Sequence, residues 1–201
     1  MDKVLKSISY IFHPLLMPIL GVVFYFSKTP RYTSTEVIQA KLVSLTILTI
    51  ILPILLYFLL KTLGKVESIY LKTTKERIIP LALNFVVTLI VLKRILLPAR
   101  DLELYFFFLG ILISTLSCLI LALLKFKASI HMMALSGLLM FFIALSIHFS
   151  ININGTLALM AIIIGAVATS RLHVKAHSVK ELIIGFFIGF IPQLILINYW
   201  L

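Results

Sequence analysis

The distribution of apolar residues constrains this chain more than any other feature. A helix needs roughly 20 mostly apolar residues to cross a bilayer, because backbone polar groups in lipid must pair within the segment. Seven apolar runs follow one another with short connections between them: Ile11–Phe26, Val37–Leu60, Ile78–Leu97, Leu102–Leu124, Met132–Phe149, Thr156–Thr169 and Leu182–Trp200. We therefore predict an all-α polytopic bundle of about seven membrane spans, with the ends of the short first and sixth runs least defined.

Composition agrees with one membrane-embedded domain over residues 1–201. Hydrophobic residues make up 62% of the chain and charged residues 12%, about half the charged share of a soluble domain. No hydrophilic stretch is long enough for a second domain. The N-terminal run follows Lys3 and Lys6, as in a signal peptide, but His13 and two prolines interrupt it and no cleavage site follows. We interpret it as a retained first span, with His13 and Pro14 near its start.

The charged residues are distributed unequally between the two expected faces of the membrane. If every run crosses, the connections after the second, fourth and sixth runs lie on the N-terminal side. That side holds most of the 18 lysines and arginines and four of the five histidines: His13, His131, His173 and His177. Such a face suits anionic headgroups or a phosphorylated ligand, and no nucleic-acid motif is present. The cation excess favours the cytoplasmic side of a cell membrane, with a bacterial inner membrane as our expectation.

The densest polar group is the segment from Ser170 to Glu181, which also contains Arg171, His173 and His177. If this segment is the start of a helix, His177 and Glu181 are four residues apart and share a face. A carboxylate there holds one imidazole nitrogen and leaves the other as a base or nucleophile. The alternative is a structural hydrogen-bonded pair at a helix end, and His173 is a weaker rival for the role of His177.

Two further polar groups precede spans on the same side. The first is Lys127-Ala128-Ser129-Ile130-His131, and the second runs from Lys72 through Lys75 and Arg77 to Pro80. A cation, a hydroxyl, an imidazole and a helix N-terminus together suit a phosphate. Each also has a simpler interpretation: Ser129 as a helix cap, Arg77 as a cation reaching the interface, and the lysines, Lys175 included, as interfacial anchors.

Together the three groups resemble the type 2 phosphatidic acid phosphatase superfamily over roughly Lys72 to Gly189. Its third signature, Ser-Arg-x(5)-His-x(3)-Asp, matches Ser170, Arg171 and His177, with Glu181 in place of the aspartate. The second, Pro-Ser-Gly-His, is kept as Ser129 and His131 without its proline and glycine. The first, Lys-x(6)-Arg-Pro, is reduced to Arg77 and Pro80, which are separated by two residues in place of being adjacent. The three occur in the family's order.

The resemblance implies a metal-independent hydrolase without a cofactor, acting on a lipid phosphate or a polyprenyl diphosphate. His177 would attack phosphorus and form a phosphohistidine, Glu181 would orient it, and His131 would protonate the leaving group and later assist water. The phosphoryl oxygens would be held by Arg171, Ser129, Arg77 and Ser170, with Lys127, Lys72 or Lys75 in place of the missing lysine. The family's sites more often lie outside the cytoplasm, so the side of the membrane stays open.

Two other functions stay open at this point. The same cations suit a transporter or channel for an anionic lipid or solute, although transport sites favour charges near mid-span and most of these spans have none there. A non-catalytic binder of lipid headgroups is the third hypothesis. Gly185 and Gly189 form a Gly-x(3)-Gly pair in the last run, which indicates close helix packing within the chain or between chains of a homo-oligomer.

Overall fold

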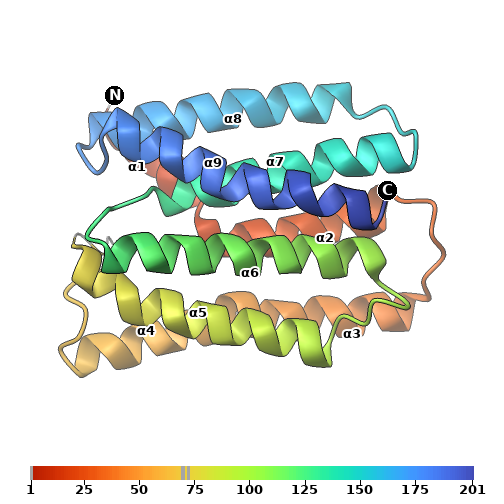
Figure 1. The fold of residues 1–201 in the computed structure, drawn as a ribbon, viewed down its shortest axis with the longest axis horizontal. Helices are drawn as coiled ribbons and strands as arrows, with labels where there is room; N and C mark the ends of the chain where they lie inside the picture. The colour runs from red at the N-terminus through yellow and green to blue at the C-terminus, as the bar shows by residue number, and fades with distance from the viewer. Residues whose placement is uncertain (1, 69–70, 72) are drawn as a thin grey trace.

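The computed structural model describes residues 2–68, 71 and 73–201, and every regular element in them is helical. The longer helices lie side by side along one axis, with connections at the two ends of the bundle (Figure 1). The elements are α1 (Asp2–Ile11), α2 (Met17–Lys28), α3 (Thr35–Thr46), α4 (Leu52–Thr62), α5 (Thr74–Arg94), α6 (Leu102–Leu123), α7 (Ile130–His148), α8 (Asn154–His173) and α9 (Val179–Leu196), with three short segments, η1 (Pro14–Leu16), η2 (Ile47–Ile51) and η3 (Ile197–Tyr199).

Six helical stretches among the described residues are long and apolar enough to cross a membrane: Ser7–Lys28, Thr35–Thr62, Leu102–Leu123, Ile130–His148, Asn154–His173 and Val179–Tyr199. The all-α prediction is confirmed, and these helices are compatible with a multi-pass membrane protein. The predicted third run corresponds to α5, which is not among the six and has charged residues in its first and last turns, Glu76, Lys93 and Arg94 among them. The sixth run, predicted to be short, is the full-length α8.

The first predicted run is not one continuous helix. The chain leaves α1 at Ile11, turns through η1, and enters α2 at Met17. Pro14 has no backbone N–H and disfavours the helical conformation of the residue before it, and His13 has extended backbone angles. This break places α1 against the C-terminal half of the bundle, where it contacts α8, while α2 packs against α7.

A proline also changes the second run. The helix continues from Thr35 to Thr62 but widens to a π-helical turn over Ile47–Ile51, just before Pro53. Pro53 cannot donate a backbone hydrogen bond to the preceding turn, which favours such a distortion. The turn leaves Thr49 buried and directed to the inside of the bundle, with its hydroxyl donating to Leu45 O at 2.8 Å.

Helix α7 lies at the centre of the bundle, and α9 packs along it. Close approach depends on Gly185 and Gly189, since a Cβ on Gly185 would lie 2.6 Å from Ser129 O and one on Gly189 would lie 1.9 Å from Met133 O. The Ser136 hydroxyl then donates to Phe186 O across the same contact at 2.7 Å. The Gly-x(3)-Gly pair therefore serves packing within the chain, and a homo-oligomer stays a prediction.

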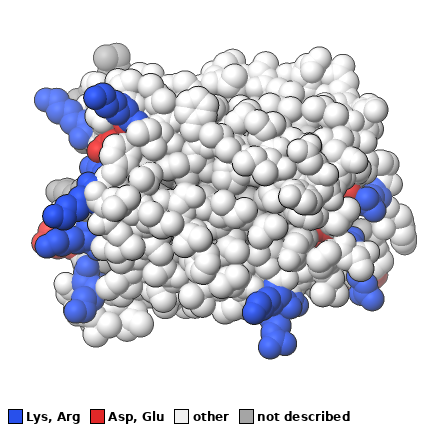
Figure 2. Space-filling model, viewed as in Figure 1, with Lys and Arg blue, Asp and Glu red and all other residues white. Residues whose placement is uncertain are grey.

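Charged side chains lie mainly toward the two ends of the bundle, and the flank between them in this view is largely uncharged (Figure 2). At the end away from the N-terminus, the fully buried Glu103 accepts from the Tyr25 hydroxyl at 3.0 Å and pairs with Arg31 at 2.7 Å. His148 Nε2 lies 3.4 Å from the same carboxylate. This cluster ties α2, α6 and α7 together at that end and leaves the other end for the three predicted site segments.

Candidate functional site

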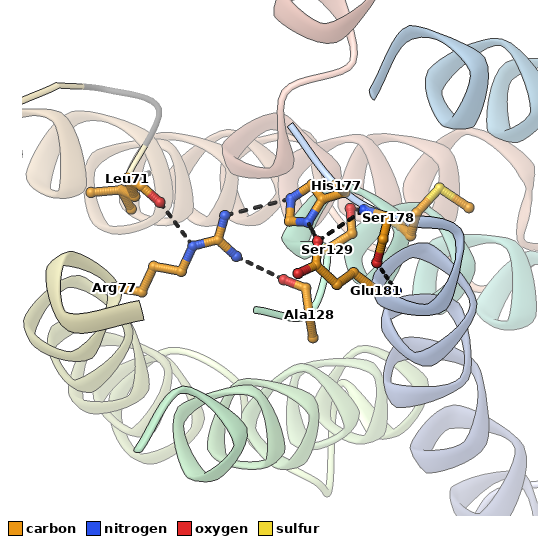
Figure 3. Close-up of polar contacts among 8 residues, drawn as sticks. Leu71, Arg77, Ala128, Ser129, His177, Ser178 and Glu181 are labelled. Carbon is orange, nitrogen blue, oxygen red and sulfur yellow. Dashed lines mark hydrogen bonds and ion pairs between the residues drawn. The ribbon is translucent and has the colours of Figure 1, made fainter. Parts of the chain in front are cut away.

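The three predicted site segments meet at the end of the bundle where α5, α7 and α9 begin. Arg77 joins them from the first turn of α5, and its side chain is 4% exposed. Its Nη1 donates to Ala128 O at 2.7 Å, its Nε to Leu71 O at 3.0 Å, and its Nη2 lies 3.5 Å from His177 Nε2 (Figure 3). One guanidinium therefore contacts the segments before α7 and before α9.

His177 lies just before α9 and is held by the first turn of that helix. Its Nδ1 is 2.8 Å from Glu181 Oε2, and its side chain is 1% exposed. Ser178 caps α9 and accepts from Glu181 N, while Glu181 Oε2 accepts from Ser178 N at 3.1 Å, so a capping box fixes the carboxylate (Figure 3). Because Glu181 accepts and Arg77 can only donate, the imidazole carries its proton on Nδ1 and presents a lone pair at Nε2.

The protonation of His177 follows from its surroundings. Burial is the largest cause that lowers the pKa of His177, and the nearby guanidinium of Arg77 is the second. Together they lower it from 6.5 to about 4, although the hydrogen bond to Glu181 opposes them. The imidazole is therefore neutral at pH 7. Burial, followed by Arg77, also lowers the pKa of Lys127, which precedes α7. The site thus holds a neutral imidazole beside several cationic side chains.

Helix α1 covers the second predicted histidine. His131, in the first turn of α7, has its Nε2 3.2 Å from Ser9 O. The Ser9 hydroxyl is 2.7 Å from the Ser170 hydroxyl, and Ser170 also donates to Leu5 O at 2.5 Å. Ser170 thereby fastens α1 to the last turn of α8, which is the turn that carries the buried Arg171.

A cavity of about 1020 Å³ opens beside these groups and runs into the bundle between α2, α4, α5, α6 and α7. Its polar end is lined by Ser9, His13, Arg77, Lys127, His131, Arg171, Lys175 and His177. Most of its remaining wall is apolar, with Leu56, Phe58, Leu81 and Phe108 among its residues. Asn84 and Thr115 add a polar pair at 3.5 Å from each other, seven residues and about 10 Å along α5 from Arg77.

The predicted site residues occupy different positions relative to this cavity. Five of them line it: Arg77, Lys127, His131, Arg171 and His177. Three lie behind that wall, Glu181 against His177, Ser170 against α1, and Ser129 as the cap of α7, where its hydroxyl accepts from Met132 N at 3.4 Å. Lys75 is exposed and is not among the lining residues. Lys72 lies outside the described residues.

Two features of the site differ from the sequence interpretation. The segment from Ser170 to Glu181 is not one helix start, because Ser170–His173 is the last turn of α8 and α9 begins only at Val179. A turn with a positive φ at Lys175 joins them. His13, interpreted as part of a span start, lines the polar end of the cavity, with its ring centroid 5.6 Å from that of His131. Its position next to Pro14, which breaks helices, is the sequence feature that could have indicated a turn at His13.

Across the described residues, no three His, Cys, Asp or Glu side chains are grouped so that they could hold a metal ion. The arrangement instead offers a lone pair at His177 Nε2, several N–H donors from Arg77 and Arg171, and an ammonium group from Lys127. Donors of this kind fit the oxygens of a phosphoryl group. An apolar wall continues from that polar end toward the middle of the bundle.

Comparison of the chain with protein-family models, with curated proteins and with solved structures found no match. The superfamily resemblance therefore depends on the three segments and on nothing outside this chain. Arg77 and His177 are 100 positions apart in the sequence, and they meet at one end of the bundle.

Proposed function

We propose that this chain is a membrane-embedded phosphatase that hydrolyses a lipid phosphate or polyprenyl diphosphate in a cell membrane through His177. The observation that carries the proposal is the imidazole held between Glu181 and Arg77, with Nδ1 2.8 Å from the carboxylate and Nε2 3.5 Å from the guanidinium. A neutral imidazole with its lone pair beside phosphate-binding cations is the arrangement that nucleophilic attack on phosphorus requires.

In the proposed reaction, the phosphoryl group binds at Arg77, Arg171 and Lys127 and replaces the contact between Arg77 Nη2 and His177 Nε2. Nε2 attacks phosphorus, an N–P bond forms, the bond to the lipid oxygen breaks, and His131 gives the leaving oxygen a proton. The ring becomes cationic because Nδ1 keeps its proton, and the carboxylate of Glu181 stabilises that charge. Water then gives a proton to His131 and attacks the phosphohistidine, the N–P electron pair returns to Nε2, and inorganic phosphate leaves.

The cavity supports a substrate with an apolar tail. Its polar end lies at the end of the bundle where α5, α7 and α9 begin, and its largely apolar wall continues into the bundle past Leu81 and Phe108. A chain that lies there stays at bilayer depth while its headgroup reaches Arg77 and His177. The proposal also counts α5 as a seventh crossing, since its 21 residues pack along α6 and are about 31 Å long.

The test is phosphate release by the purified protein in detergent, with chelator present, from phosphatidic acid, phosphatidylglycerol phosphate and undecaprenyl diphosphate. We expect release from at least one lipid and a loss of about 10³-fold or more in His177→Asn, because the nucleophile is removed. His173→Asn is the matched control, since His173 is exposed at the end of α8 and does not line the cavity. Tight lipid binding without release would instead support a non-catalytic binder.

A further inference from the structure

His13 occupies a place that its sequence context does not suggest. It is the cap of the short η1 segment, and its Nδ1 accepts from Leu15 N at 3.3 Å. A nitrogen that accepts a hydrogen bond carries no proton, so the neutral ring of His13 has its proton on Nε2. The break between α1 and α2 thus places an imidazole at the polar end of the cavity in one defined tautomer.

The imidazole of His131 lies beside that of His13. The two rings meet edge to face with centroids 5.6 Å apart. Nε2 of His131 donates to Ser9 O at 3.2 Å, so its neutral form has a lone pair at Nδ1. One ring therefore offers a proton and the other accepts one, while two cationic rings at this distance would repel each other.

The surroundings of this pair favour one additional proton, which makes one of the two rings cationic, only when an anion is present. The other charged or titratable side chains that line the polar end of the cavity are Tyr10, Arg77, Lys127, Arg171, Lys175 and His177. Four of these six are cationic at pH 7, which disfavours an imidazolium beside them. A phosphoryl group in the cavity neutralises part of that charge and favours protonation of one ring.

From this geometry we propose that His13 and His131 act as one pair that supplies the proton to the leaving lipid oxygen. The proposal depends on the phosphatase function and adds a second imidazole to it. When the bond between phosphorus and the lipid oxygen breaks, the oxygen takes a proton from the pair and leaves as an alcohol, or as a lipid monophosphate from a diphosphate. When water attacks the phosphohistidine, the pair takes a proton from that water and returns to its starting state.

Two substrates with matched tails and different leaving groups test the pair. The leaving group of dodecyl phosphate is an alkoxide, which needs a proton. The leaving group of 4-dodecyl-2-nitrophenyl phosphate is a stabilised nitrophenoxide, which does not. In His13→Asn, the amide oxygen can still accept from Leu15 N and keep the turn. We expect its kcat/KM to fall about 10²-fold or more for dodecyl phosphate and to change less than about threefold for the nitrophenyl substrate.

The pair is tested by combining substitutions. His131→Asn should show the same selective loss, and His13→Asn with His131→Asn should be no worse than the more damaging single variant, because residues that act as a unit are not additive. His173 is an exposed histidine at the same end of the bundle, and His173→Asn should keep its kcat/KM on both substrates.

Three results would overturn the inference. Equal losses on both substrates would make His13 only structural, unchanged rates would give it no role, and multiplicative losses in the double variant would separate the two rings. In all three, hydrolysis that depends on His177 leaves the phosphatase proposal intact. If the unaltered chain hydrolyses neither these substrates nor any membrane lipid phosphate, the phosphatase proposal fails and takes this inference with it.

Discussion

Replacement of Gly189 by alanine is a sharp test of how the site is positioned. An added Cβ would lie 1.9 Å from Met133 O and 2.4 Å from Ser136 Oγ. Ordinary van der Waals contact begins at 3.4 Å, so α9 and α7 must separate locally by 1.5 Å, the difference between 3.4 and 1.9. The obstructing atom is backbone, which cannot move aside as a side chain can. We expect destabilisation of about 1–3 kcal/mol, the usual range for overpacking, toward its upper end.

The same displacement reaches the proposed site. Helix α9 carries Glu181, whose carboxylate orients His177. The backbone carbonyl of Glu181 accepts from Ser129 N, just before α7, at 3.0 Å. A shift of about 1 Å in a catalytic group costs roughly 10²-fold in rate. Gly189→Ala should therefore lose phosphate release by about that factor even at temperatures where the protein stays folded.

The assay is thermal unfolding in detergent, followed by phosphate release at a temperature below the unfolding transition of each variant. Gly165→Ala is the control, because Gly165 lies in α8 and a Cβ there meets no atom within 4 Å. Alanine also raises helix propensity by about 1 kcal/mol, so this control should be as stable as the parent or more so. If Gly189→Ala is as stable and as active as Gly165→Ala, the α7–α9 packing described above is wrong.

Three further outcomes are expected. Glu181→Gln should lower kcat about 10²-fold or more with a smaller change in KM, since a neutral amide cannot stabilise a cationic phosphohistidine; equal kcat would contradict this. Because burial lowers the pKa of His177 to about 4, phosphohistidine formation should persist to about pH 5 and fall below pH 4 as Nε2 gains a proton, and a fall near pH 6.5 in a pH–rate profile would refute the shift. His177 binds fewer protons in the folded state, so its contribution to stability should decrease as pH falls from 6.5 to 4. Glu103→Gln should lower the thermal transition, because the pair with Arg31 is lost at a buried position, while its effect on phosphate release stays small; unchanged unfolding would contradict the role of this cluster.

Much of the helical layout follows from the spacing of apolar residues, because lipid requires long uninterrupted runs. The third run shows why spacing alone is insufficient. Arg77 is 4% exposed inside a helix end, and whether such a cation reaches the interface or turns inward depends on acceptors from other segments. Those acceptors, Leu71 O and Ala128 O, are backbone groups that a sequence does not mark.

The candidate site was predictable where its chemistry is local. The spacing of His177 and Glu181 indicated one contact, and the structure contains it as part of a capping box. The contribution of α1 was not predictable, because it depends on the direction in which the chain leaves the break at Pro14. That direction is set by contacts with α8, including the Ser9–Ser170 hydrogen bond, which join residues 161 positions apart.

The most direct test of the central claim is the identity of the phosphorylated residue during turnover. Phosphatidic acid or undecaprenyl diphosphate labelled with ³²P at the terminal phosphate is mixed with the protein and quenched in alkali, in which phosphohistidine survives. The label should map to the peptide that contains His177 and disappear in His177→Asn. Turnover with no protein-bound label at any quench time, or label that persists in His177→Asn, would contradict the account.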